Sequence, residues 1–244
     1  RSFDRSMPEE INRIVTDALA DYLFVSEPSG LANLDKEGVS RKKVFFVGNI
    51  MIDTLMANLS KLKGSGILNK LSLDPRRYMV LTLHRPSNVD SRASVQNVYN
   101  ILKHIAKSTQ IIYPIHPRSR KMMNRYGILS KLKKLDNVKI IDPLGYIDFI
   151  RLVKDARFVM TDSGGIQEET TMLGIPCITL RENTERPITI TEGTNYLTGL
   201  SKKKIIRLID TILKGRAKKG RQLKYWDGRT ALRIGAILKK RSRE

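Results

Sequence analysis

The 244-residue sequence is short of cysteine, of long apolar runs and of acidic residues, and each shortage excludes a class of protein. Its single cysteine, Cys177, excludes an internal disulfide and a metal site built from several thiolates, and it favours a reducing, cytoplasmic compartment. No stretch approaches the about 18 uncharged apolar residues of a membrane span, so no membrane partner is predicted. The chain starts at Arg1 without a Met or a signal-peptide core, which indicates a start inside a longer sequence.

Acidic residues are outnumbered, because 45 Lys and Arg face 24 Asp and Glu and give a formal net charge of +21. Such an excess raises nucleic acid as a partner. The basic residues, however, form scattered groups without interleaved aromatic residues or zinc-ligand spacing, which is typical of solvated helix faces. We therefore predict no nucleic-acid partner. A basic nucleic-acid-binding protein stays an alternative, and it would bind with a steep dependence on salt.

Hydrophobic residues make up 41% of the chain, enough for a sizeable core, and their pattern alternates between strand and helix. Strand-like segments lie at 22–25, 44–47, 79–83, 110–115, 138–141, 158–161 and 177–180. Helix-like segments lie at 8–19, 51–63, 95–106, 119–132, 146–155, 166–173, 205–214 and 229–240. Strands that alternate with helices predict an α/β fold, a Rossmann-like parallel sheet covered on both faces in three layers.

One segment follows a predicted strand with small residues and then acids: Thr161-Asp-Ser-Gly-Gly-Ile-Gln-Glu-Glu169. In open parallel sheets, ligands bind at the carboxyl ends of the strands. Gly164 and Gly165 let a ligand approach the backbone, and their amides with the Ser163 hydroxyl predict a phosphate cradle at a helix N-terminus. An ordinary helix capped by Ser163 or Asp162 is the alternative. Glu169, one turn further on, suits the hydroxyl groups of a ribose.

Cationic side chains follow three other predicted strands. His84 and Arg85 come after 79–83, His116 and Arg118 after 110–115, and Arg186 lies in the loop after 177–180. Each alone is compatible with a strand-end or loop residue, but together they predict an anionic ligand, either a nucleotide or a sugar derivative. The three histidines of the chain lie on different segments, so we predict no metal site.

The segments HRPSN (84–88), YPIHPR (113–118), DSGGIQEE (162–169), LRENTERP (180–187) and EGTNYL (192–197), with RSFDRSMPEEINR at the start, resemble the non-hydrolysing UDP-N-acetylglucosamine 2-epimerases. The resemblance implies two Rossmann-like domains across a cleft, as in GT-B glycosyltransferases, of which this chain is the C-terminal half. It assigns residues 1–47 to the end of the first domain, 48–218 to the UDP-binding domain, and 219–244 to a helix that returns to the first domain.

The resemblance also implies a reaction. UDP-GlcNAc becomes UDP-ManNAc by elimination of UDP to a glycal and re-addition of UDP, without a cofactor, in a cytoplasmic homodimer that supplies cell-surface polysaccharide. Other catalytic acids of the family belong to a segment ahead of Arg1, the missing N-terminal domain. We therefore expect this chain alone to bind UDP weakly without turnover. A GT-B glycosyltransferase is the second enzyme interpretation, but such an enzyme should lack the PEEINR element (8–13) that this sequence has.

Residue roles follow from the same resemblance and from the strand-end chemistry. Glu9 is the predicted catalytic acid or base, and without the resemblance it would be an ordinary first-turn helix acid. His84 is predicted to stabilise charge on the departing UDP. Phe149 matches a uracil contact, with core packing as the alternative. The remaining predicted UDP or substrate contacts are Arg85, His116, Ser163, Gly164, Gly165, Glu169 and Arg186.

Overall fold

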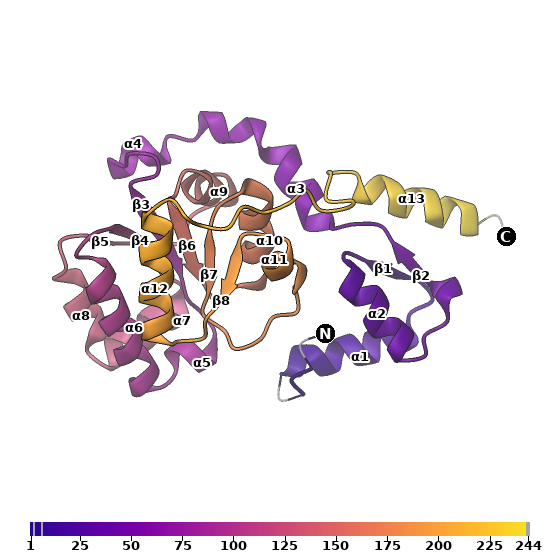
Figure 1. The fold of residues 1–244 in the computed structure, drawn as a ribbon, viewed down its shortest axis with the longest axis horizontal. Helices are drawn as coiled ribbons and strands as arrows, with labels where there is room; N and C mark the ends of the chain where they lie inside the picture. Colours follow the sequence, from indigo (N-terminus) through magenta and orange to yellow (C-terminus); the bar gives the residue numbers. More distant parts are fainter. Residues whose placement is uncertain (2, 6, 243–244) are drawn as a thin grey trace.

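The computed structural model describes residues 1, 3–5 and 7–242 and is organised around a six-stranded parallel sheet (Figure 1). The strands are β3 (Tyr78–Thr82), β4 (Gln110–Pro114), β5 (Val138–Ile141), β6 (Phe158–Thr161), β7 (Cys177–Thr179) and β8 (Asn195–Leu197). Their order is β5-β4-β3-β6-β7-β8, and every neighbouring pair is parallel. The two central strands, β3 and β6, are almost entirely buried because helices cover both faces, so both read as continuous apolar runs.

Two hydrophobic clusters, one on each face, make the fold three-layered. The larger cluster joins the sheet to α6 (Arg92–Ile105), α7 (Pro117–Arg125), α8 (Ile128–Lys133) and α12 (Lys202–Leu213). The second joins it to α4 (Ile67–Leu71), α9 (Tyr146–Lys154) and α10 (Gly164–Leu173). A third, smaller cluster packs α3 (Ile50–Asn58) and Trp226 against α9 and α10. The predicted Rossmann-like α/β fold is therefore confirmed.

A small N-terminal unit stands beside this sheet (Figure 1). It consists of α1 (Pro8–Leu19), β1 (Leu23–Val25), α2 (Pro28–Lys36), the turn Arg41–Lys43 and β2 (Val44–Phe46). Strands β1 and β2 pair in parallel around a core of Leu23, Val25 and Leu34. The last helix, α13 (Thr230–Arg241), lies beside this unit, and its Arg233 donates to the Val47 carbonyl at 3.1 Å. In the segment ahead of the helix, the Trp226 indole donates to the Ser26 carbonyl at 3.1 Å.

Several predicted helix boundaries were wrong. The single helix predicted at 119–132 is two helices, α7 and α8, because Gly127 adopts a left-handed φ of 68° between them. The helix predicted at 51–63 ends at Asn58 and is followed by the turn Ser60–Gly64. The short helices α2, α4, α5 (Pro86–Val89) and α11 (Ile188–Thr191) and the strand β8 were not predicted. No helix within the described residues has both the length and the apolarity to cross a bilayer.

Candidate functional site

The strand order creates a crevice at the carboxyl ends of β3 and β6. These strands are neighbours, but the chain proceeds from β3 to β4 on one side and from β6 to β7 on the other. The loops that leave them therefore diverge, and this is where open α/β sheets bind ligands. Thr82 and Thr161 are register partners whose hydroxyls lie 2.6 Å apart, so the two strands end level. His84 and Ser163 follow within two residues.

Asp162 ties the two loops together. Its fully buried carboxylate accepts hydrogen bonds from the backbone N–H of His84 at 3.1 Å, from that of Arg85 at 2.9 Å and from the Asn88 amide at 3.0 Å. His84 Nδ1 lies 2.9 Å from it. Burial by itself raises the pKa of Asp162, but the His84 hydrogen bond and these N–H groups outweigh it and hold the pKa below its usual value. Asp162 thus faces β3 instead of capping α10, and the Ser163 side chain makes no cap hydrogen bond either.

Four of the predicted site residues line one cavity of about 250 Å³ at these strand ends: His84, His116, Phe149 and Ser163. The rings of His84 and His116 have centroids 5.7 Å apart. His116 has a structural role as well, because its Nδ1 accepts the Arg118 N–H at 3.2 Å and caps α7. Phe149 also packs against two hydrophobic clusters, so core packing and cavity lining both apply to it.

The N-terminus of α10 has the geometry of an anion cradle. The helix begins at Gly164, and the Arg186 guanidinium lies against this glycine: a Cβ there would sit 2.8 Å from Arg186 Nη1 and 3.1 Å from Cζ. Glu168 holds the same guanidinium, with 2.9 Å from its Oε1 to Arg186 Nε. Free helix amides and a fixed cation therefore converge on one spot, a combination that suits a phosphate.

Glu169 lies one turn further along α10 and is 5% exposed. Burial raises its pKa to about 7, against a hydrogen bond from Tyr146 that lowers it, while the neighbouring Glu168 raises it further. The two oxygens of Glu169 can accept hydrogen bonds from a pair of sugar hydroxyls, and in the protonated form, which is populated near neutral pH, the carboxyl group can also donate one.

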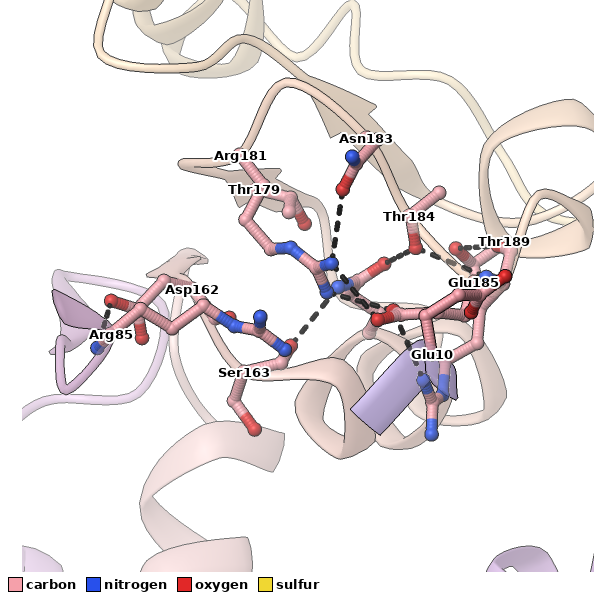
Figure 2. Close-up of polar contacts among 12 residues, drawn as sticks. Glu10, Arg85, Asp162, Ser163, Thr179, Arg181, Asn183, Thr184, Glu185 and Thr189 are labelled. Atoms are coloured by element: carbon pink, nitrogen blue, oxygen red, sulfur yellow. Dashed lines mark hydrogen bonds and ion pairs between the residues drawn. The ribbon is translucent and has the colours of Figure 1, made fainter. Parts of the chain in front are cut away.

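A second cavity, of about 710 Å³, opens on the other side of the β3 loop. Glu9 on α1 and Arg85 line it together with Asn88 and Arg181. Because His84 and Arg85 are consecutive, the two cavities flank a single loop. Arg85 also donates from Nε to the Asp162 carbonyl at 3.0 Å, and Figure 2 shows the two side by side. Burial first, and then the nearby Arg181 charge, lower the pKa of Arg85.

An ion-pair cluster connects α1 to the loop after β7 (Figure 2). Arg181, which is 6% exposed, donates twice to Glu185, at 2.8 and 3.0 Å. Arg13 of α1 spans Glu10, at 2.7 Å, and Glu185, at 3.3 Å. Burial by itself raises the pKa of Glu185, but the Arg181 hydrogen bonds outweigh it and bring the pKa to about 2. Glu185 is therefore a carboxylate at any ordinary pH.

The sequence did not predict the contacts that join different elements at the site. These are the hydrogen bonds of Asp162 to the loop after β3 and the ion pairs of Arg181 and Glu185. The sequence carried one usable signal, an arginine and a glutamate four residues apart directly after an apolar strand. Glu10 was overlooked beside Glu9, although it is the buried one of the two.

Comparison with known proteins decides the family. The sequence model of the UDP-N-acetylglucosamine 2-epimerases matches residues 1–239. The chain belongs to the UDP-N-acetylglucosamine 2-epimerase family. A curated member from Methanocaldococcus jannaschii is 40% identical over 244 residues, which cover 98% of this chain and 66% of that protein. The UDP-2,3-diacetamido-2,3-dideoxy-D-glucuronate 2-epimerase of Pseudomonas aeruginosa is 35% identical over 243 residues, which cover 98% of this chain and 66% of that protein.

The structure agrees with this epimerase family. The crystal structure of the Methanocaldococcus jannaschii UDP-GlcNAc 2-epimerase in complex with UDP-GlcNAc and UDP superposes with a TM-score of 0.90 at 39% identity. That match covers 98% of this chain and 67% of the solved one, so the chain spans about two thirds of the length of its relatives in the epimerase family. Within the described residues, no three His, Cys, Asp or Glu side chains converge into a group that could hold a metal ion.

Proposed function

We propose that this chain forms the UDP-binding part of a UDP-GlcNAc 2-epimerase. One observation carries the proposal: His84, Ser163, Gly164 and Arg186 converge where β3 and β6 end, in a chain of the epimerase family. The diphosphate would lie on the α10 N-terminus beside Arg186, with the uracil against Phe149 and the ribose hydroxyls on Glu169. The division into residues 1–47, 48–218 and 219–244 belongs to the same proposal.

The proposed chemistry inverts C2 of the sugar in two steps. In the first, the C1–O bond breaks, its electron pair leaves with UDP, the C2 proton passes to a base, and a C1=C2 double bond forms. In the second, C2 receives a proton on the opposite face and a UDP oxygen bonds to C1 again. The C2 proton is weakly acidic, so stabilising the departing diphosphate matters as much as the base does. His84, Arg186 and the α10 amides are the proposed stabilising groups, and Glu9, exposed in the second cavity, is a proposed acid or base.

A reducing, cytoplasmic setting is supported by the single buried Cys177, and a homodimer that serves polysaccharide synthesis is supported by the family resemblance. The Pseudomonas aeruginosa relative is named for a UDP-diacetamido-glucuronate substrate. That nucleotide sugar should therefore be assayed beside UDP-GlcNAc.

Calorimetric titration of the 244-residue chain with UDP, CDP and uridine tests the proposal. We expect saturable binding with UDP preferred, and a loss of at least about tenfold in the Arg186→Ala variant, because one charge-assisted hydrogen bond contributes about 1.5–3 kcal/mol. Equal binding of any polyanion, with a steep dependence on salt, would support the nucleic-acid alternative instead. Conversion of UDP-GlcNAc to UDP-ManNAc in D₂O, followed by NMR, would show whether the residues present here suffice for turnover.

A further inference from the structure

His84 occupies the centre of the candidate site, and one of its two ring nitrogens is already engaged. Nδ1 lies 2.9 Å from Asp162 Oδ1, and the histidine side chain is 41% exposed while that of Asp162 is fully buried. The ring therefore has one nitrogen held in the protein interior and the other, Nε2, left for the cavity that His84 lines. Which nitrogen carries a proton in the neutral ring depends on the partner of the first.

Asp162 can act on Nδ1 only as a hydrogen-bond acceptor. Its Oδ2 already accepts the N–H of Arg85 and the amide of Asn88, and the His84 N–H is shared between Oδ1 and Oδ2. Asn88 is itself fixed by a second hydrogen bond, to the Leu180 carbonyl at 3.0 Å. A carboxylate surrounded by donors in this way is ionised, so the hydrogen atom between it and His84 has to reside on Nδ1.

We propose that Asp162 is a positioning residue for His84. It keeps a proton on Nδ1 and thereby makes Nε2 the nitrogen that meets a ligand phosphate. In the imidazolium form, Nε2–H donates a hydrogen bond to a phosphate oxygen, and the Asp162 charge balances the ring. The inference rests on the proposed function, since it assigns the ring nitrogen that faces the diphosphate. In this role Asp162 orients the His84 ring and fixes its tautomer but does not take its proton.

The neighbouring histidine provides an internal control. His116 Nδ1 accepts the backbone N–H of Arg118, so its neutral ring must carry the proton on Nε2. Two histidines that line one cavity are therefore expected in opposite tautomers, Nδ1–H for His84 and Nε2–H for His116. The polarity or solvent exposure of the shared cavity would act on both rings alike, so opposite tautomers would have to come from their different Nδ1 partners.

The experiment is a long-range ¹H–¹⁵N correlation spectrum of the ¹⁵N-histidine-labelled 244-residue chain at a pH of about 8.5, where an ordinary histidine is neutral. Signals are assigned with His84→Gln and His116→Gln. We expect the two tautomers to differ as stated. His84 in the Nε2–H form in the wild-type chain overturns the proposal, and this measurement needs no Asp162 variant to fold.

Asp162→Asn supplies the second readout. Asparagine has a single acceptor oxygen for the backbone donors, so its NH₂ group faces Nδ1 and the His84 tautomer should invert to Nε2–H. We expect UDP affinity to fall by roughly five- to tenfold, because Nε2–H of the inverted ring donates to the phosphate from a neutral imidazole whereas the wild-type ring donates as an imidazolium; uridine affinity should stay unchanged. Equal losses for UDP and uridine, or an unchanged tautomer, contradict the positioning role. Failure of the wild-type chain to bind UDP would instead count against the proposed function, whatever the tautomers are.

Discussion

Replacing Gly164 by alanine should separate stability from binding. The new Cβ would come within 2.8 Å of Arg186 Nη1 and 3.1 Å of Cζ, so the guanidinium has to shift away from Gly164, which displaces it from the α10 N-terminus and disturbs its 2.9 Å contact with Glu168. Gly164 is the first residue of α10 and its φ is not positive, so alanine fits the backbone and should stabilise the fold by about 0.4–1 kcal/mol, because it reduces the entropy of the unfolded chain. Loss of the cation from the cradle should cost UDP binding about 1.5–3 kcal/mol, or roughly 10- to 150-fold in Kd.

The assay pairs calorimetric titration with UDP and urea denaturation of the same variant. Introducing Gly164→Ala into an Arg186→Ala background is the matched control, because a substitution that acts through Arg186 has little left to remove there, less than about twofold. Wild-type UDP affinity in Gly164→Ala would refute the assignment of Arg186 to the cradle. A further large loss in the double variant would mean instead that the methyl group obstructs the ligand directly.

Four other substitutions test stability, each by urea or thermal denaturation. The folded chain keeps a proton on Glu169 up to a pH of about 7, whereas the unfolded chain releases it near 4.5. The free energy of unfolding should therefore fall as the pH rises from about 4.5 to 7. At pH 8 the Glu169→Gln variant should be more stable than the wild-type chain, by up to about 3 kcal/mol. Asp53 accepts the N–H groups of Thr230 and Ala231 at 3.1 and 2.7 Å and so caps α13 from α3; Asp53→Ala should cost about 1 kcal/mol and speed amide exchange in α13. Gly127→Ala should cost about 1–2 kcal/mol for its left-handed backbone, since no atom crowds the position. Gly48→Ala should cost clearly more, because its Cβ would overlap the backbone of Tyr225; equal losses for the two glycines would contradict this.

The sheet was predictable because its central strands are buried on both faces and its strands end at polar turns. Segment 158–161 is apolar up to Thr161 and fully buried, while the edge segment 138–141 is apolar except for the exposed Lys139, and the structure has both strands with the predicted bounds. The prediction failed where helices are short or interrupted. The apolar spacing across Gly127 stays in phase, so periodicity alone gives one helix where the backbone makes two. Strand β8 has only three residues, and its pairing with β7 comes from tertiary structure.

The candidate site was predictable as a set of strand ends but not as a set of contacts. The Ser163 turn and His84 were identified from their positions after apolar segments. That Asp162 links these two loops depends on β3 and β6 being neighbours, although their last residues are 79 positions apart in the chain. A linear pattern does not contain this adjacency. The same holds for Arg13 and Glu185, which meet only after α1 comes to lie against the loop that follows β7.

The contact between Gly48 and Tyr225 has a mechanical consequence. The chain leaves the N-terminal unit for the sheet at Val47–Asn49, and a later segment, between Leu223 and Thr230, brings α13 beside that unit; the two segments touch where Gly48 meets the Tyr225 backbone. At the other end of the unit, Arg13 of α1 forms an ion pair with Glu185 next to the phosphate cradle. The N-terminal unit is therefore held to the sheet both at the Gly48 crossing and beside the candidate site, so a displacement of α1 would be felt at the cradle.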